Sequence, residues 1–153
     1  MEKVFDTGKF LRIQRYSNEL FSKKIETAAA RCELSKPEAD MLLFFANNPS
    51  FHSAADAAKY RGVSKAYVSK ALTQLLDKGY ISTEVDAHDR RCQKIAVTEK
   101  AAKAITTLRA AQESFSQMLT VNMSETERDE MLRLMEKMMD GIEKTYVASK
   151  LAD

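Results

Sequence analysis

Residues 53–97 hold the arrangement that most restricts how this chain can fold. Two helix patterns, one opening at Ser53 and one at Ser64, are joined by a short turn at Gly62. A helix, a three- to four-residue turn with glycine and a second helix form a helix-turn-helix. Residues 80–85 and 92–97 then alternate apolar and polar side chains with a period of two, which predicts two strands. A hairpin directly after a helix-turn-helix predicts a winged helix-turn-helix.

Helical patterns also flank this segment. Apolar residues recur at helical spacing over residues 9–32, and a Ser-Lys-Pro-Glu capping box at 35–38 opens a helix that ends at Asn47. A long helix follows Thr98, and another capping box at 124–127 opens a last one. In this last helix Met131, Met135, Met138 and Ile142 recur every three or four residues, and so broad an apolar face needs a partner.

The patterns together predict a mainly α fold with a small β-wing, a winged helix-turn-helix flanked by N- and C-terminal dimerisation helices. Four Gly and two Pro in 153 residues agree with a high helix content. We expect one compact domain overall, with a dimerisation helix over 1–34, a DNA-binding core over 35–99 and C-terminal dimerisation helices over 100–153.

Composition and charge narrow the function. The chain is 44% hydrophobic and 30% charged, as in soluble globular proteins. It contains no apolar run long enough for a membrane span and no apolar N-terminal segment typical of secretion signals, so we expect a cytoplasmic protein. The net charge is +2, but residues 59–94 hold eight basic against four acidic residues. This local excess of positive charge favours a polyanionic partner.

The second helix of the helix-turn-helix has one apolar and one polar face. Val68, Leu72, Leu75 and Leu76 form the expected core face. The candidate DNA-binding residues of this helix are Ser64, Lys65, Ala66, Tyr67, Ser69, Lys70 and Thr73. Their hydroxyls and ammonium groups can contact base edges or phosphates, although an exposed amphipathic helix that meets only water is the alternative.

The predicted hairpin tip supplies a second candidate surface. It contains His88, Asp89, Arg90 and Arg91. We expect Arg91 to enter a narrow minor groove, where negative potential attracts a guanidinium, and Arg90 to meet a phosphate. Asp89 would hold an arginine side chain in place. A salt bridge at the tip with no ligand is the alternative.

The chain resembles the MarR (multiple antibiotic resistance regulator) family over nearly its whole length. The resemblance lies in LSKPEADMLLFFANNP, in GVSKAYVSKALTQLLDKGYI, and in DRRCQKIAVT, which fits the family's wing signature at Asp89, Arg91, Val97 and Thr98. One departure is His88, where the family commonly has Arg or Lys; histidine is mostly neutral at pH 7.

The resemblance implies a homodimer clasped by its terminal helices. Each protomer would place the second helix of the helix-turn-helix in a major groove of double-stranded DNA and its wing in the flanking minor groove. The operator would then be pseudo-palindromic. The resemblance also implies a repressor released by a small amphipathic or phenolic effector bound between the dimer and DNA-binding parts.

Two alternatives stay open within the same fold. The first is a redox-responsive regulator, because Cys92 follows Arg91 and a neighbouring cation can make a thiol reactive. Cys32, in contrast, is expected to be a small residue of the core. The second is a helical-dimer module that binds protein without specific DNA binding.

We expect no enzyme, because the sequence lacks a Gly-rich phosphate loop, a nucleophile motif and a cluster of acids and histidines. We likewise expect no metal site and no cofactor.

Overall fold

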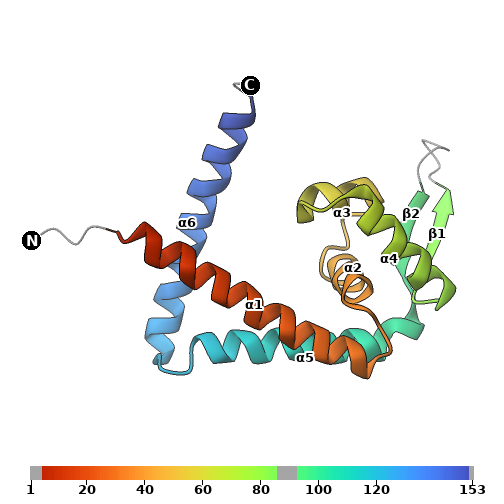
Figure 1. Ribbon diagram of the computed structural model, residues 1–153, viewed down its shortest axis with the longest axis horizontal. Helices are drawn as coiled ribbons and strands as arrows, with labels where there is room; N and C mark the ends of the chain where they lie inside the picture. The colour runs from red at the N-terminus through yellow and green to blue at the C-terminus, as the bar shows by residue number, and fades with distance from the viewer. Residues whose placement is uncertain (1–4, 86–92, 152–153) are drawn as a thin grey trace, which may run out of the picture. The chain divides into compact units, whose positions relative to one another are not determined.

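The computed structural model describes residues 5–85 and 93–151 and is mainly helical, with one small antiparallel sheet (Figure 1). The predicted fold class is thereby confirmed. The elements are α1 (Thr7–Arg31), α2 (Lys36–Asn47), α3 (Ala54–Arg61), α4 (Lys65–Asp77), β1 (Ile81–Val85), β2 (Gln93–Val97), a 3-10 turn η1 (Glu99–Ala101), α5 (Ala102–Leu119) and α6 (Glu125–Leu151).

The chain divides into two compact units between Phe115 and Ser116. The first unit contains α1 to β2 and most of α5, and the second contains the end of α5 and all of α6. This division falls inside the segment expected to form the C-terminal dimerisation helices. The expected boundaries at 34/35 and 99/100 remain predictions.

Serine caps fix where the helices of the first unit begin. The Ser35 side chain accepts from the Glu38 amide at 3.4 Å, and the Glu38 carboxylate accepts from the Ser35 amide at 2.6 Å. This is the reciprocal capping box that the sequence predicts. The side chains of Ser53 and Ser64 cap α3 and α4, and each accepts a hydrogen bond from the backbone amide three residues further along. The helix starts are therefore local consequences of the sequence.

Gly62 sets the turn between α3 and α4. Its backbone is left-handed, with φ 63° and ψ 33°, and its amide donates back to the end of α3. A side chain at this backbone conformation is strained, whereas glycine adopts it readily. The turn predicted from Gly62 is confirmed, and it directs the chain into α4.

The hairpin pairs residues 81–85 with residues 93–97 in antiparallel register, with Ile81 opposite Val97 and Val85 opposite Gln93. The amide of Ile95 also donates to the carbonyl of His52, which ties β2 to the segment before α3. The connection that joins the two strands lies outside the described residues.

The core of the first unit lies where α2 packs against α1, α4 and β2. The five successive apolar residues of α2 from Met41 to Phe45 are all buried. On α4, Val68, Leu72 and Leu75 are buried as expected, whereas Leu76 is partly exposed at the edge of that face. At the far end of α2, Arg109 of α5 donates to the carbonyl of Ala46 and to the Asn47 side chain.

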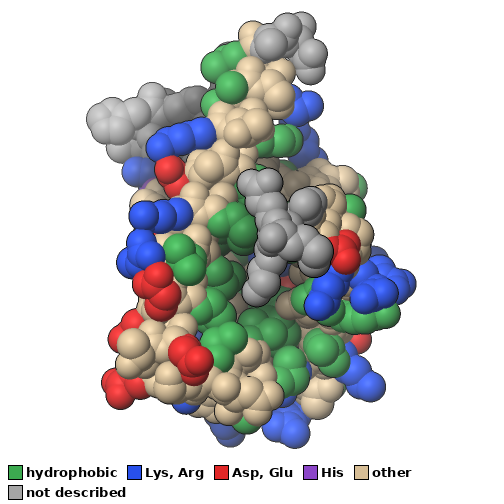
Figure 2. Space-filling view, turned by 90° about the vertical axis from the view of Figure 1, so that its left-hand side faces the viewer, with side chains coloured by type: hydrophobic (Ala, Val, Ile, Leu, Met, Phe, Trp, Pro, Cys, Tyr) green, Lys and Arg blue, Asp and Glu red, His purple; other side chains and the backbone are tan. Residues whose placement is uncertain are grey.

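In the second unit, α6 has no buried residue although its sequence is rich in apolar side chains. Hydrophobic side chains gather along its surface beside charged ones (Figure 2). The exposed apolar residues of α6 are Leu132, Leu134, Met135, Met138, Met139, Ile142, Tyr146, Val147 and Leu151. Within the described ranges, no helix combines the length and apolarity needed to cross a bilayer.

Candidate nucleic-acid interface

The α4 helix exposes most of the side chains that the sequence predicts for DNA contact. Exposed residues are Ser64, Lys65, Ala66, Ser69, Lys70 and Thr73. The Ser64 hydroxyl oxygen already accepts from the amide of Tyr67 at 3.1 Å, and the Thr73 hydroxyl donates to the carbonyl of Ser69 at 3.0 Å. The hydrogen-bond donors that this face of α4 presents to a ligand are therefore mainly the ammonium groups of Lys65 and Lys70 and the hydroxyl of Ser69.

Tyr67 differs from the expectation that it lies on the outer polar face of α4. Its side chain is half-buried, and its hydroxyl donates to Asp40 Oδ2 of α2 at 3.0 Å. Burial first, and then the neighbouring Asp40 carboxylate, raise the pKa of Tyr67 to about 12. The hydroxyl of Tyr67 thus points inward, and the outer face of α4 exposes fewer of the candidate DNA-binding side chains than the sequence predicted.

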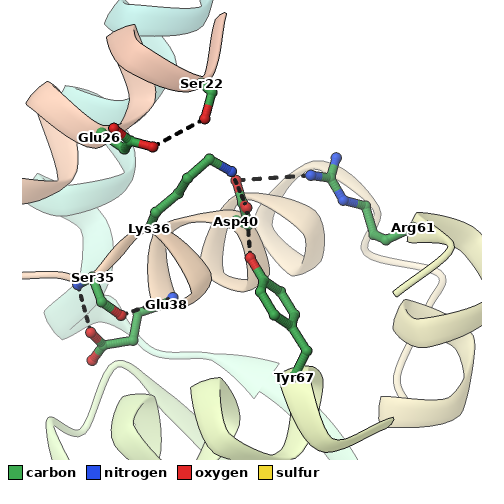
Figure 3. Close-up of polar contacts among 8 residues, drawn as sticks. All are labelled: Ser22, Glu26, Ser35, Lys36, Glu38, Asp40, Arg61 and Tyr67. Carbon is green, nitrogen blue, oxygen red and sulfur yellow. Dashed lines mark hydrogen bonds and ion pairs between the residues drawn. The ribbon is translucent and has the colours of Figure 1, made fainter. Parts of the chain in front are cut away.

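Asp40, which no sequence pattern singled out, contacts residues of both helices of the helix-turn-helix. Its carboxylate is 6% exposed and lies 2.5 Å from Lys36 Nζ and 3.8 Å from Arg61 Nη2 (Figure 3). Lys36 belongs to the same helix, one turn earlier, and Arg61 ends α3. The i, i+4 spacing of Lys36 and Asp40 is visible in the sequence, but the approach of Arg61 and Tyr67 depends on tertiary packing.

A second buried carboxylate of α2 holds the other end of α4. Glu38 Oε1 lies 2.7 Å from Nζ of Lys78, the residue that caps α4. Lys78 also donates to the carbonyl of Glu33, in the turn before α2, at 2.7 Å. Burial alone would raise the pKa of Glu38, but hydrogen bonds from Lys78 and Ser35 outweigh it, and the pKa is lowered. Glu38 is therefore held in its charged form at neutral pH.

The predicted wing-tip residues His88, Asp89, Arg90 and Arg91 lie outside the described residues, and so does Cys92. The strands that carry them are described. A groove of about 420 Å³ lies between α4 and the hairpin, lined among others by Ser69, Thr73, Thr83 and Gln93. Polar side chains of α4 and of the strands therefore face one common recess.

Residues suited to other chemistry are sparse in the described parts of the chain. No group of three or more metal-binding side chains occurs there. Cys32 is half-buried and packs against the core. A groove of about 700 Å³ between α1 and α5 is lined by apolar and cationic side chains, among them Leu20, Ala28, Lys23, Lys24 and Arg31.

Comparison with known proteins agrees with the resemblance found in the sequence. Residues 33–91 match the model of the MarR family. A MarR protein from Peptoclostridium difficile DA00132 has a similar structure, with 20% identity, a TM-score of 0.73 and coverage of 95% of this chain and 94% of that one. A MarR transcriptional regulator from Methanosarcina mazei Go1 gives 16% identity, a TM-score of 0.77 and coverages of 94% and 95%.

A similar structure has also been determined with DNA. The crystal structure of an S. aureus MepR–DNA complex has a TM-score of 0.66 and 20% identity to this chain, and it covers 92% of this chain and 99% of that one. The MarR resemblance and the winged helix-turn-helix fold are confirmed by these matches.

Proposed function

We propose that this chain, which has the fold of the MarR family and matches its family model over residues 33–91, is a dimeric, sequence-specific DNA-binding transcriptional regulator. The observation that carries the proposal is the outer face of α4. It presents Lys65, Ser69 and Lys70 to solvent on a helix held by a glycine turn and followed by a hairpin. Side chains of this kind supply donors to base edges and phosphates.

Charge supports the same partner. The segment 59–94, which contains α4, β1 and the start of β2, carries the local excess of positive charge. A dimer doubles this excess on one assembly. Because binding to DNA releases counterions from the phosphates, affinity should fall steeply as salt rises. The wing residues Arg90 and Arg91 add to the contact in this proposal, with Arg91 in the minor groove.

The dimer is supported by the unpartnered apolar surfaces of both terminal helices. No residue of α6 is buried, and Leu11, Ile13, Tyr16 and Leu20 of α1 are exposed. Large exposed apolar patches mark interaction sites in soluble proteins. A second copy of the chain offers the same surfaces, and two-fold symmetry then presents two α4 helices to a pseudo-palindromic operator.

The proposed regulation is repression relieved by a small amphipathic or phenolic effector. The groove between α1 and α5 supports this part of the proposal, because apolar side chains and the cations Lys23, Lys24 and Arg31 line it together. Such a lining suits a molecule with an apolar body and an anionic or phenolic group. An effector that binds only the DNA-free conformation would lower DNA affinity by linkage.

The direct experiment is selection of bound fragments from the parent genome by the purified full chain. Affinity for a selected duplex and for a scrambled duplex of equal length is then measured at several salt concentrations. Specific binding should exceed non-specific binding by at least about 10³. Equal affinity for both duplexes at every salt concentration rejects a sequence-specific regulator and favours an interaction module. In vitro transcription from a selected promoter, with and without a panel of phenolic acids, tests repression and release.

A further inference from the structure

The Asp40 carboxylate joins three helices at the point where α4 begins. Asp40 lies in α2, Arg61 ends α3, and Tyr67 lies in the first turn of α4 (Figure 3). The Tyr67 hydroxyl and the Lys36 ammonium group both contact Asp40 Oδ2, and the Arg61 guanidinium lies 3.8 Å from Asp40 Oδ1. The Asp40 side chain therefore contacts both helices of the helix-turn-helix.

Such a carboxylate holds its partners firmly. A charge removed from water is costly unless cations and hydrogen bonds compensate for it. Two cations and one hydroxyl do so for Asp40, which is 6% exposed. A shift of the α4 first turn away from α2 breaks the Tyr67 contact and leaves one carboxylate oxygen less well satisfied. The network thus resists a change in the direction of α4.

We propose that Asp40 is a positioning residue for DNA recognition: through Tyr67 it fixes the first turn of α4, so that Lys65, Ser69 and Lys70 meet the bases in one orientation. This inference rests on the proposed function, because it concerns how α4 meets DNA. Hydrogen bonds to base edges need accurate placement, whereas ionic contacts to phosphates tolerate small displacements. Loss of the network should therefore reduce specific binding more than non-specific binding.

The test compares Tyr67→Phe and Asp40→Asn with the natural full chain. Each protein is titrated with the selected duplex and with the scrambled duplex at one salt concentration. For Tyr67→Phe, which keeps the ring and removes only the hydroxyl, the ratio of specific to non-specific affinity should fall about tenfold. An unchanged ratio of specific to non-specific affinity in Tyr67→Phe overturns the inference. Because Tyr67→Phe removes only one hydroxyl, this test holds even if the Asp40→Asn protein fails to fold.

The double variant separates positioning from direct contact. If Tyr67 acts only through Asp40, then Asp40→Asn combined with Tyr67→Phe should lower the ratio no further than the stronger single change. Additive losses would show that Tyr67 and Asp40 act independently of each other, and would overturn the inference.

Asn47→Ala is the matched control for general loosening. Asn47 ends the same helix α2, is neutral, and its side chain hydrogen-bonds to Arg109 and Gln112 of α5. The control should lower the melting temperature and leave the affinity ratio unchanged. A ratio that falls as far in Asn47→Ala as in Tyr67→Phe contradicts a special role for Asp40.

Failure of the inference and failure of the proposed function look different in this design. If the natural chain prefers the selected duplex and the variants show the same preference, only the inference fails. If the natural chain itself shows no preference for any selected duplex, the proposed function fails, and the inference fails with it.

Discussion

The hydroxyl of Tyr67 in α4 donates a 3.0 Å hydrogen bond to the carboxylate of Asp40 in α2, two residues that stand 27 positions apart in the chain. This contact turns a side chain of the predicted DNA-binding face toward the protein interior. It also links the two helices whose packing forms much of the core of the first unit. The first turn of α4 is therefore anchored from within, while its outer face stays open to a ligand.

The Tyr67–Asp40 contact predicts a late-ionising tyrosine. Burial and the Asp40 charge raise the pKa of Tyr67 from 10.0 to about 12, so one of the five tyrosines should ionise only near pH 12. Absorbance at the phenolate band measures this, and far-ultraviolet circular dichroism shows whether the chain is still folded. Tyr67→Phe should remove the late step, and Asp40→Asn should move it to lower pH. Completion of every tyrosine ionisation well below pH 12 in the folded protein would refute the contact.

The Glu38–Lys78 pair predicts a stability effect that depends on pH. Because the folded pKa of Glu38 lies below the ordinary 4.5, its contribution to stability is present above that pH. The contribution is lost as the pH falls through the lower, folded pKa. At pH 7, Lys78→Met leaves a buried carboxylate without its cation and should lower the free energy of unfolding by about 1–3 kcal/mol.

Urea unfolding at pH 7 and below pH 4 measures this effect at a fixed protomer concentration. The loss caused by Lys78→Met should shrink as the pH falls and Glu38 becomes protonated, because a neutral carboxyl group needs no cation. Adding Glu38→Gln to Lys78→Met should restore part of the stability at pH 7. An equal loss at both pH values would mean that Lys78 stabilises the fold through its hydrogen bond to the Glu33 carbonyl or through packing, and not through the charge of Glu38.

Substitution of Gly62 should lower the stability of the fold through backbone strain alone. No heavy atom lies within 4 Å of a Cβ placed on Gly62, but its φ of +63° is unfavourable for other L-residues. Gly62→Ala should therefore lower the free energy of unfolding by about 1 kcal/mol. Gly62→Asn should cost less, because asparagine tolerates the left-handed region better. Equal stability of the glycine and alanine proteins in urea would show that the turn adopts another conformation.

The apolar surface of α6 predicts an association that charge can disrupt. Met138 and Ile142 are 40% and 54% exposed and α6 has no buried residue, so Met138→Glu combined with Ile142→Glu leaves the buried core of the protomer unchanged. By light scattering, the natural chain should show twice the protomer mass of 17.3 kDa, and the double variant should show the mass of one protomer. Glu136→Lys is the control, because position 136 lies on the opposite face of the helix from 138, and it should leave the dimer intact. A double variant that stays dimeric would move the interface away from this face of α6.

Local rules in the sequence were enough to predict most of the fold. The capping box at Ser35 and Glu38, the caps at Ser53 and Ser64, and the left-handed turn at Gly62 each depend on residues within a few positions of one another. Hydrophobic periodicity then separated the buried Val68 and Leu75 from the exposed Lys70. Such features are readable because the physics that sets them is local.

The candidate site was only partly predictable. Periodicity places Tyr67 beside the polar residues of α4, but it cannot show that its hydroxyl meets a carboxylate from another helix. Asp40 stands directly before a run of apolar residues, where a charged side chain gives no sign of its partners. Arg61 and Lys78 reach their carboxylates only after α2, α3 and α4 have packed. Contacts between distant segments need the tertiary structure.

Methylation interference on a selected operator tests the central claim most directly, namely that two α4 helices enter the major groove. Methyl groups on guanine N7 block the major groove without altering the phosphates. We predict two clusters of interfering guanines whose centres lie about 10 base pairs, or a multiple of that, apart. Binding that is insensitive to guanine N7 methylation at every position, or a single cluster, would contradict it.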